Sequence, residues 1–272
     1  MIEAIEYINK EKSPRGRIKA AVFDFDGTFS TLRCGWEKVM EPLMLECISG
    51  GKKETYPPEL IEKVKNYIDT STGIQTIYQM QWLKEETKKA GYGSENKDAW
   101  YYKDEYNTRL MEEIKGRIES VKNGEKSPEN FLIKGAVEFL NTLIESGIEV
   151  YLASGTDHKD VVKEAAALKV ADKFTEIKGA PERKAACSKE AVIRMSLKEK
   201  NLPGEALLLV GDGKVEIALG KECGAFTIGA ATNEEDLEGV NPVKRQRLIK
   251  AGADIIVGDF QNLPELKKWL GI

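Results

Sequence analysis

Beyond residue 128, short apolar runs alternate with longer segments whose apolar residues recur at helical spacing. The runs predict buried strands, placed at 148–153, 174–177, 206–210, 225–228 and 254–257. The longer segments predict helices, placed at 136–146, 161–168, 189–200, 215–223 and 263–270. Apolar strands that alternate with helices are typical of a parallel sheet with helices on both faces.

The first half of the chain has a different pattern. Residues 1–12 repeat isoleucine at intervals of three, which predicts a helix. The run 18–25 (IKAAVFDF) predicts a buried strand that ends in an Asp-Gly turn. From residue 30 to 128 apolar residues recur at helical spacings among many Glu and Lys, which predicts four or more helices.

The helical segment therefore interrupts one sheet-forming domain. We predict an α/β fold with a Rossmann-like parallel-sheet core of residues 1–29 and 130–272, and an all-helical domain of residues 30–129 inserted after the first strand. A chain of 272 residues has room for one large domain that carries a smaller one.

Composition excludes several classes of function. The 41 basic and 45 acidic side chains give a formal charge of -4, so we expect neither nucleic acid nor a membrane surface as a partner. No run approaches the ~20 apolar residues of a spanning helix, and residues 1–12 lack the pattern of a signal peptide. The four cysteines have no C-x-x-C spacing, so we expect reduced thiols and a cytoplasmic protein. The single histidine, His158, excludes a multi-histidine metal site.

Three of the predicted strands end in residues that can do chemistry. Asp24 and Asp26 follow the first strand, Ser154 follows the second, and Asp212 follows the strand at 206–210. In open α/β sheets ligands bind at the carboxyl ends of the strands. Aspartates gathered there raise one another's pKa values unless a cation lies among them, and a site made only of oxygens suits Mg²⁺.

The order of these motifs resembles that of the haloacid dehalogenase superfamily. D-x-D-G-T follows the first strand, the next strand ends in Ser, a Lys comes later, and G-D is followed by an acid four residues on. The resemblance covers residues 18–29 and about 130–272. It implies transfer of a phosphoryl group through an aspartyl-phosphate intermediate.

The resemblance also implies roles for the first motif. Asp24 would be the nucleophile and a ligand of Mg²⁺. Asp26 would be the general acid and base, and its backbone carbonyl would bind the metal. Thr28 would steady this loop and help to bind the phosphate.

The later motifs complete the implied site. Ser154 and the N–H group of Gly155 would bind the transferring phosphoryl group. Asp212 would ligate Mg²⁺, and Glu216 would lie behind the ligands and support the metal from there.

The family also needs a lysine before the G-D strand, and three are candidates. Lys178 falls at the end of a strand, Lys184 in a loop, and Lys189 at the start of a helix. Lys189 precedes Asp212 by 23 residues (212 − 189), which is room for a helix, a loop and a strand. We therefore favour Lys189 for catalysis and phosphate binding, with Lys184 as the alternative.

An insertion at this point resembles the helical cap of the phosphoglycolate-phosphatase-like branch. Such a cap would cover the carboxyl edge of the sheet, exclude water and contact the leaving group, which favours a small phosphorylated metabolite over a protein. Arg33 leaves the nucleophile loop first, and Gln75 lies in a polar turn between two predicted helices. We expect both to contact the leaving group.

These inferences predict a Mg²⁺-dependent phosphohydrolase of a small phosphorylated metabolite, with a sugar phosphate as one example. A phosphomutase or another phosphotransferase remains the alternative, because the same site could return the phosphoryl group to a sugar. No feature of the sequence specifies an oligomeric state.

Overall fold

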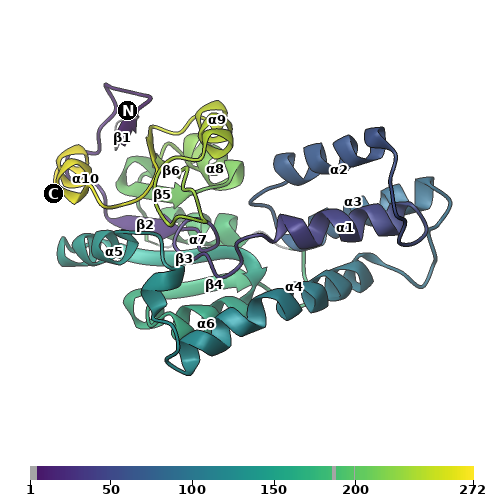
Figure 1. Ribbon diagram of the computed structural model, residues 1–272. Helices are drawn as coiled ribbons and strands as arrows, with labels where there is room; N and C mark the ends of the chain where they lie inside the picture. The colour runs from purple at the N-terminus through teal and green to yellow at the C-terminus, as the bar shows by residue number, and fades with distance from the viewer. Residues whose placement is uncertain (1–4, 186–187, 199) are drawn as a thin grey trace.

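The computed structural model describes residues 5–185, 188–198 and 200–272. Figure 1 shows two parts: an α/β core that contains both ends of the chain, and a helical cap beside it. The predicted fold class, a largely parallel sheet with an inserted helical unit, is confirmed. The predicted limits of the two domains, 1–29 with 130–272 and 30–129, stay a prediction.

The described residues of the core form one sheet in the order β1-β7-β6-β5-β2-β3-β4. Its strands are β1 (Ile5–Tyr7), β2 (Ala20–Phe23), β3 (Glu149–Asp157), β4 (Glu176–Ala180), β5 (Leu207–Gly211), β6 (Phe226–Ala230) and β7 (Ile255–Val257). All neighbours pair in parallel except β1, which runs antiparallel to β7. The strand order reverses at β2, and in open α/β sheets this is the point where ligands bind.

The register of β2 brings the predicted site residues level with one another. Phe23, the last residue of β2, lies opposite Leu152 of β3 and Val210 of β5. The backbone N–H of Asp24 then donates to the carbonyl of Val210 at 2.9 Å. The polar ends of three strands therefore open onto the same edge of the sheet.

Helices cover both faces of this sheet (Figure 1). Within the described residues they are α5 (Ala136–Glu145), α6 (His158–Ala167), α7 (Ser188–Lys198), α8 (Lys214–Cys223), α9 (Pro242–Ala251) and α10 (Leu263–Leu270). Five of the six coincide with predicted helices, with ends that differ by a few residues. α9 is missing from the prediction because Lys, Arg and Gln dominate it, although Asn241 caps its first turn by accepting from the N–H groups of Val243 and Lys244.

The prediction of a helix at the amino terminus is wrong. Residues 1–4 lie outside the described part, and Ile5–Tyr7 form the edge strand β1. Ile5 is 1% exposed and lies opposite Val257 of β7, so pairing with the far end of the chain decides the local structure. Tertiary pairing of this kind overrides a short helical repeat.

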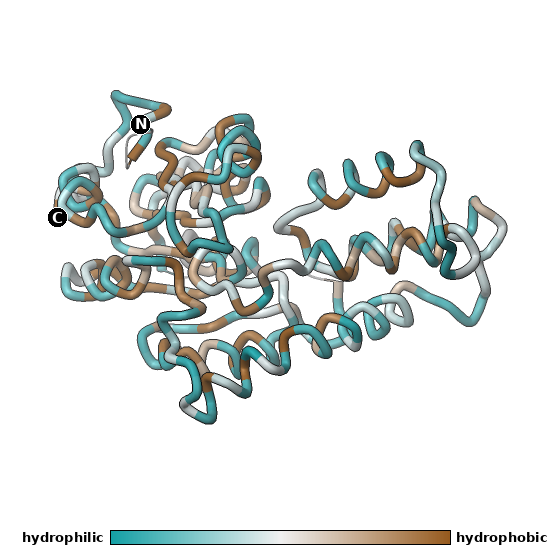
Figure 2. The backbone as a smooth tube through the Cα atoms, in the orientation of Figure 1, coloured by the Kyte–Doolittle hydropathy of each residue, from teal (hydrophilic) through white to brown (hydrophobic). Residues whose placement is uncertain are grey.

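The cap is a bundle built from the inserted segment. Its described helices are α1 (Glu37–Ile48), α2 (Pro58–Thr70), α3 (Thr76–Lys89) and α4 (Ala99–Lys122). Figure 2 shows hydrophobic positions along each of these helices. Tyr67 of α2 stacks on Trp82 of α3 with ring centres 3.8 Å apart. The largest cluster of buried apolar residues includes residues of both the cap and the core, so the two parts pack directly on each other.

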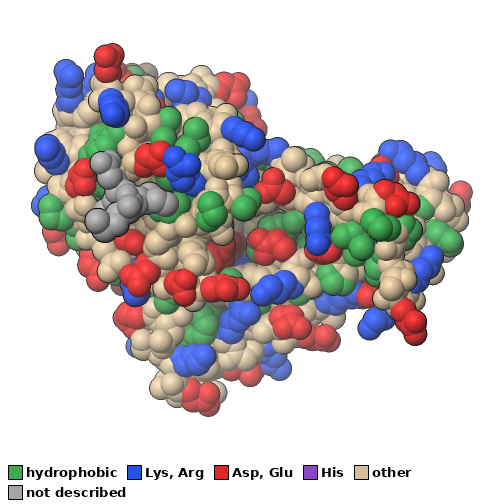
Figure 3. All heavy atoms as spheres, turned by 45° about the horizontal axis from the view of Figure 1, so that its top comes forward, with side chains coloured by type: hydrophobic (Ala, Val, Ile, Leu, Met, Phe, Trp, Pro, Cys, Tyr) green, Lys and Arg blue, Asp and Glu red, His purple; other side chains and the backbone are tan. Residues whose placement is uncertain are grey.

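The surface of the described residues has an ordinary composition. None of the helices they form is long and apolar enough to cross a membrane. On the face drawn in Figure 3, acidic and basic side chains are interspersed. Cys34, Cys47 and Cys223 are free thiols, and Cys187 lies outside the described residues.

Candidate active site

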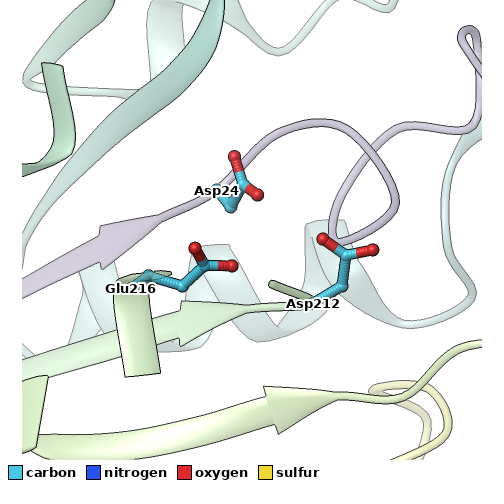
Figure 4. Close-up of side chains that lie close together, drawn as sticks. All are labelled: Asp24, Asp212 and Glu216. Atoms are coloured by element: carbon cyan, nitrogen blue, oxygen red, sulfur yellow. The ribbon is translucent and has the colours of Figure 1, made fainter. Parts of the chain in front are cut away.

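Three buried carboxylates meet at the carboxyl edge of the sheet (Figure 4). Asp24 follows β2, Asp212 follows β5, and Glu216 projects from the first turn of α8. One oxygen of each lies within 4.8 Å of the others, and each residue is at most 6% exposed. Carboxylates buried this closely need positive charge beside them.

Lys189 supplies part of that charge. Its Nζ lies 2.9 Å from Oδ2 of Asp24 and 2.9 Å from Oε2 of Glu216, and the residue is 3% exposed. Lys178 instead lies 3.3 Å from Glu176, and Lys184 is exposed. Among the three lysines considered from the sequence, the structure brings only Lys189 to the expected nucleophile.

The electrostatics of Asp24 favour a bound cation. Burial raises the pKa of Asp24 well above its usual range, the ammonium of Lys189 opposes this, and the carboxylates of Glu216 and Asp212 raise it further. A divalent cation among these oxygens would reverse the balance and keep Asp24 ionised. The donor set is made of hard oxygens only, so the residues present fit Mg²⁺.

Glu216 is fixed by two partners. Its Oε1 accepts from the backbone N–H of Gly213 at 2.6 Å and so caps α8, while Oε2 accepts from Lys189 at 2.9 Å. Both carboxylate oxygens are thus already engaged. This placement agrees with a supporting role behind the ligands.

The second aspartate of the first motif lies beside the end of β3. Oδ2 of Asp26 accepts from the hydroxyl of Thr156 at 2.8 Å and from that of Ser154 at 3.3 Å. The Thr156 hydroxyl was not predicted as part of the site, although the triplet Ser-Gly-Thr after a predicted strand was a visible signal. These contacts hold a second carboxyl, 24% exposed, at the edge of the cavity described below.

The loop after β2 is tight for a steric reason. Gly27 has φ +72°, and a side chain on it would collide with the carboxylate of Asp212. Thr28 follows it and is fully buried. Glycine at this position therefore lets the loop after β2 approach the end of β5.

The turn between α2 and α3 closes over the same edge. The carbonyl of Gly73 accepts from Nζ of Lys189 at 3.4 Å. A Cβ on Gly213 would lie 3.0 Å from Cα of Gly73, and a Cβ on Gly155 would lie 3.1 Å from the carbonyl oxygen of Ile74. Glycines on both sides therefore allow this turn of the cap to approach the core closely.

The cavity at this edge is partly open and measures about 90 Å³, well below the ~300–1,000 Å³ of pockets for drug-sized ligands. The core contributes Asp24, Asp26, Ser154, Gly155, Lys189 and Asp212 to its wall. The cap contributes Trp36, Thr72, Ile74, Thr76, Gln79, Tyr106 and Leu110, with Gly73 between them.

Arg33 and Gln75, the two residues expected to contact the leaving group, lie at different places relative to the cavity. Arg33 lines the cavity, but its guanidinium is committed to Glu164, with Nη2 2.6 Å from Oε1 and Nε 3.1 Å from each oxygen. Gln75 is 4% exposed and lies behind the wall, and its amide atoms have no hydrogen-bond partner among the described residues. Gln79, one turn further along α3, lines the cavity and was not predicted.

A second buried lysine was also missed. Nζ of Lys244, on α9, lies 2.7 Å from Oδ2 of Asp212 and 2.6 Å from Oε1 of Glu234. Although burial disfavours its charged form, the two carboxylates raise the pKa of Lys244. It lies on the helix that the sequence pattern did not reveal, so no local signal pointed to it.

Replacing Lys244 should therefore destabilise the protein. Lys244→Met leaves the buried carboxylate of Asp212 and the largely buried one of Glu234 without their cation, and breaking a buried ion pair from one side costs about 3–5 kcal/mol. We expect the free energy of unfolding in urea, measured with EDTA present, to fall by about 3 kcal/mol or more. Lys38→Met is the matched control, because the pair of Lys38 with Glu235 is exposed on both sides (80% and 76%). Equal unfolding curves for the two variants would contradict the assignment.

Comparison with known proteins agrees with this geometry. Among solved structures of similar fold is a predicted phosphoglycolate phosphatase from Haemophilus somnus 129pt, with 16% identity, TM-score 0.61, and coverage of 92% of this chain and 98% of that one. A β-phosphoglucomutase from Clostridium difficile has 17% identity and TM-score 0.62, and the match covers 93% of this chain and 97% of that one. A predicted phosphatase from Clostridium acetobutylicum has 18% identity and TM-score 0.57, and the match covers 92% of this chain and 97% of that one.

At these identities the structural likeness shows the fold. No protein of curated function matches the sequence. A family model, described as haloacid dehalogenase-like hydrolase, matches residues 18–224, which include the first motif, the whole cap and the G-D motif. The predicted resemblance is confirmed: the chain is an enzyme that belongs to the haloacid dehalogenase-like hydrolases.

Proposed function

We propose that the protein is a Mg²⁺-dependent phosphatase that hydrolyses a small phosphorylated metabolite through an aspartyl-phosphate on Asp24. One observation carries the proposal. Two carboxyl groups, Asp24 and Asp26, line the same small capped cavity, and Lys189 lies 2.9 Å from the first of them. A nucleophile, a proton donor and a fixed positive charge are thus available at one place.

In the first half of the reaction, Asp24 attacks phosphorus and the bond from phosphorus to the leaving oxygen breaks. Asp26, held by Thr156, gives a proton to that oxygen, so the product leaves as a neutral alcohol. Lys189 and the N–H group of Gly155 face the charge on the phosphoryl oxygens.

In the second half, Asp26 removes a proton from water as the water attacks phosphorus. The bond between phosphorus and Asp24 breaks, which releases phosphate and restores the carboxylate. Asp24, Asp212 and the backbone carbonyl of Asp26 would hold Mg²⁺, which supplies positive charge to the phosphoryl oxygens when bound. The cap keeps other water away from the intermediate.

The roles of the remaining predicted residues are part of the proposal. Thr28 and Gly27 shape the nucleophile loop, and Ser154 binds the phosphoryl group beside Asp26. Arg33 contributes to the wall of the cavity while paired with Glu164. Gln75 stays a predicted specificity residue, one that acts from behind the wall.

Replacing the nucleophile tests covalent catalysis. Asp24→Asn should retain less than about 1% of kcat towards phosphate monoesters, because the amide cannot form the acyl phosphate. Released phosphate measures the rate, and circular dichroism shows whether the variant is folded. Asp172→Asn, an exposed aspartate in the described core, is the matched control and should keep full activity. A folded Asp24→Asn enzyme with more than a few per cent of activity would exclude Asp24 as the nucleophile.

Metal removal tests the proposed dependence on Mg²⁺. Exhaustive chelation with EDTA should abolish phosphate release, and Mg²⁺ should restore it. Ca²⁺, which prefers more and longer oxygen contacts, should restore it poorly. Activity that survives chelation would show that the acids at this edge work without a divalent cation.

The phosphomutase alternative is separable in the same assay. A mutase depends on a bisphosphate that returns its phosphoryl group to the sugar, so free phosphate would be a minor product. A hydrolase releases one phosphate per substrate without any activator. The charge of the cap wall also distinguishes the two reactions, because a mutase must bind a second phosphate on that side.

A further inference from the structure

Apart from Arg33, the part of the cavity wall that the cap contributes carries no charged side chain among the described residues. This part of the wall consists of an indole, a phenol, two aliphatic groups, an amide and hydroxyls. They come from Trp36, from the turn between α2 and α3, and from helices α3 and α4. The nearest cation on that side is Arg33, and both oxygens of Glu164 lie within 3.1 Å of its guanidinium. A buried arginine paired in this way has no net charge to offer a ligand.

The charged residues of the wall as a whole have an excess of negative charge. With their paired partners included, six acids face three bases, which gives 3 − 6 = −3: Asp24, Asp26, Asp212, Glu164, Glu216 and Glu234 against Arg33, Lys189 and Lys244. A divalent cation would offset only two of these three negative charges. α3 begins at Thr76 beside the cavity, but the end of a helix adds only about half a positive charge. The transferring phosphoryl group brings negative charge of its own.

The polar groups of the cap wall suit hydroxyl groups. Nε2 of Gln79 donates to the Ser71 hydroxyl at 3.1 Å, which orients the amide and leaves its oxygen as an acceptor. Thr76 adds a hydroxyl, and Trp36 and Leu110 add apolar surface. A hydroxylated carbon chain can use all of these, whereas a second phosphate or a carboxylate would be buried without a counter-ion.

We propose that the substrate is a phosphate monoester of a small, uncharged, hydroxyl-bearing alcohol, with one phosphate and no carboxylate. This inference rests on the proposed function and specifies its substrate class. It also favours hydrolysis over a mutase reaction, because a mutase must hold a bisphosphate and therefore needs a second cationic site on the cap side.

Two matched esters test the substrate class with the wild-type enzyme. Glycerol 3-phosphate and 3-phosphoglycerate differ only by a hydroxymethyl group in place of a carboxylate. We expect kcat/KM with Mg²⁺ to be at least tenfold higher for glycerol 3-phosphate, which corresponds to about 1.4 kcal/mol of transition-state binding. Equal values, or a preference for 3-phosphoglycerate, would overturn the inference while the proposed function stands. No turnover of either ester or of an aryl phosphate would overturn the proposed function itself.

A charge placed on the cap wall provides an independent measurement. Thr76 is half-buried at the first position of α3 and lines the cavity, so Thr76→Lys puts an ammonium where the wall is neutral. The ratio of kcat/KM for 3-phosphoglycerate to that for glycerol 3-phosphate should rise about tenfold or more. Thr76→Gln, of similar length but uncharged, should leave this ratio within about twofold of the wild type. Ratios that change equally in both variants would mean that size, and not charge, sets the selectivity.

Discussion

The burial of several carboxylates at one edge of the sheet is the constraint on which the rest of this site depends. Two unit charges about 5 Å apart repel by roughly 3 kcal/mol at an effective dielectric constant of 20. The protein answers with two buried lysines, each shared between two acids: Lys189 between Asp24 and Glu216, and Lys244 between Asp212 and Glu234. Four acids and two lysines leave a charge of −2, equal and opposite to that of one divalent cation.

The same constraint connects the cap to the chemistry. The carbonyl of Gly73 accepts from the ammonium of Lys189, so the turn between α2 and α3 contacts the group that neutralises Asp24. Close approach there depends on Gly155 and Gly213, where a side chain would crowd the turn. Because cap and core also share one apolar cluster, closure over the cavity is supported by packing as well as by this polar contact.

The structural neighbours include proteins described as phosphatases and as β-phosphoglucomutases, and the core alone does not separate these reactions. For the function proposed here, the distinguishing surface is the cap wall, which would face the part of the substrate that leaves. Its one charged side chain among the described lining residues of the cap is Arg33, whose guanidinium is paired with Glu164. Selectivity of this kind arises from unfavourable burial of the wrong group as much as from attraction of the right one.

The sequence by itself determined the architecture and the centre of the site. Periodicity identified most strands and helices, because the spacing of apolar residues reports directly which face is buried. Asp24, Asp26, Ser154 and Asp212 could be placed together because parallel strands end at one edge. The spacing from Asp212 favoured Lys189 but left Lys184 as an alternative, and only the structure placed Lys189 beside Asp24. These are properties of strand ends and need no knowledge of distant contacts.

Only the tertiary structure decided which charges neutralise which. β1 became a strand because it pairs with β7 at the other end of the chain, and Lys244 reached Asp212 from a helix with few apolar residues. Arg33 follows the loop after β2 in sequence, yet its charge is neutralised by Glu164, 131 positions away. The spacing of apolar residues is a local property, whereas the pairing of buried charges depends on segments that folding alone brings together.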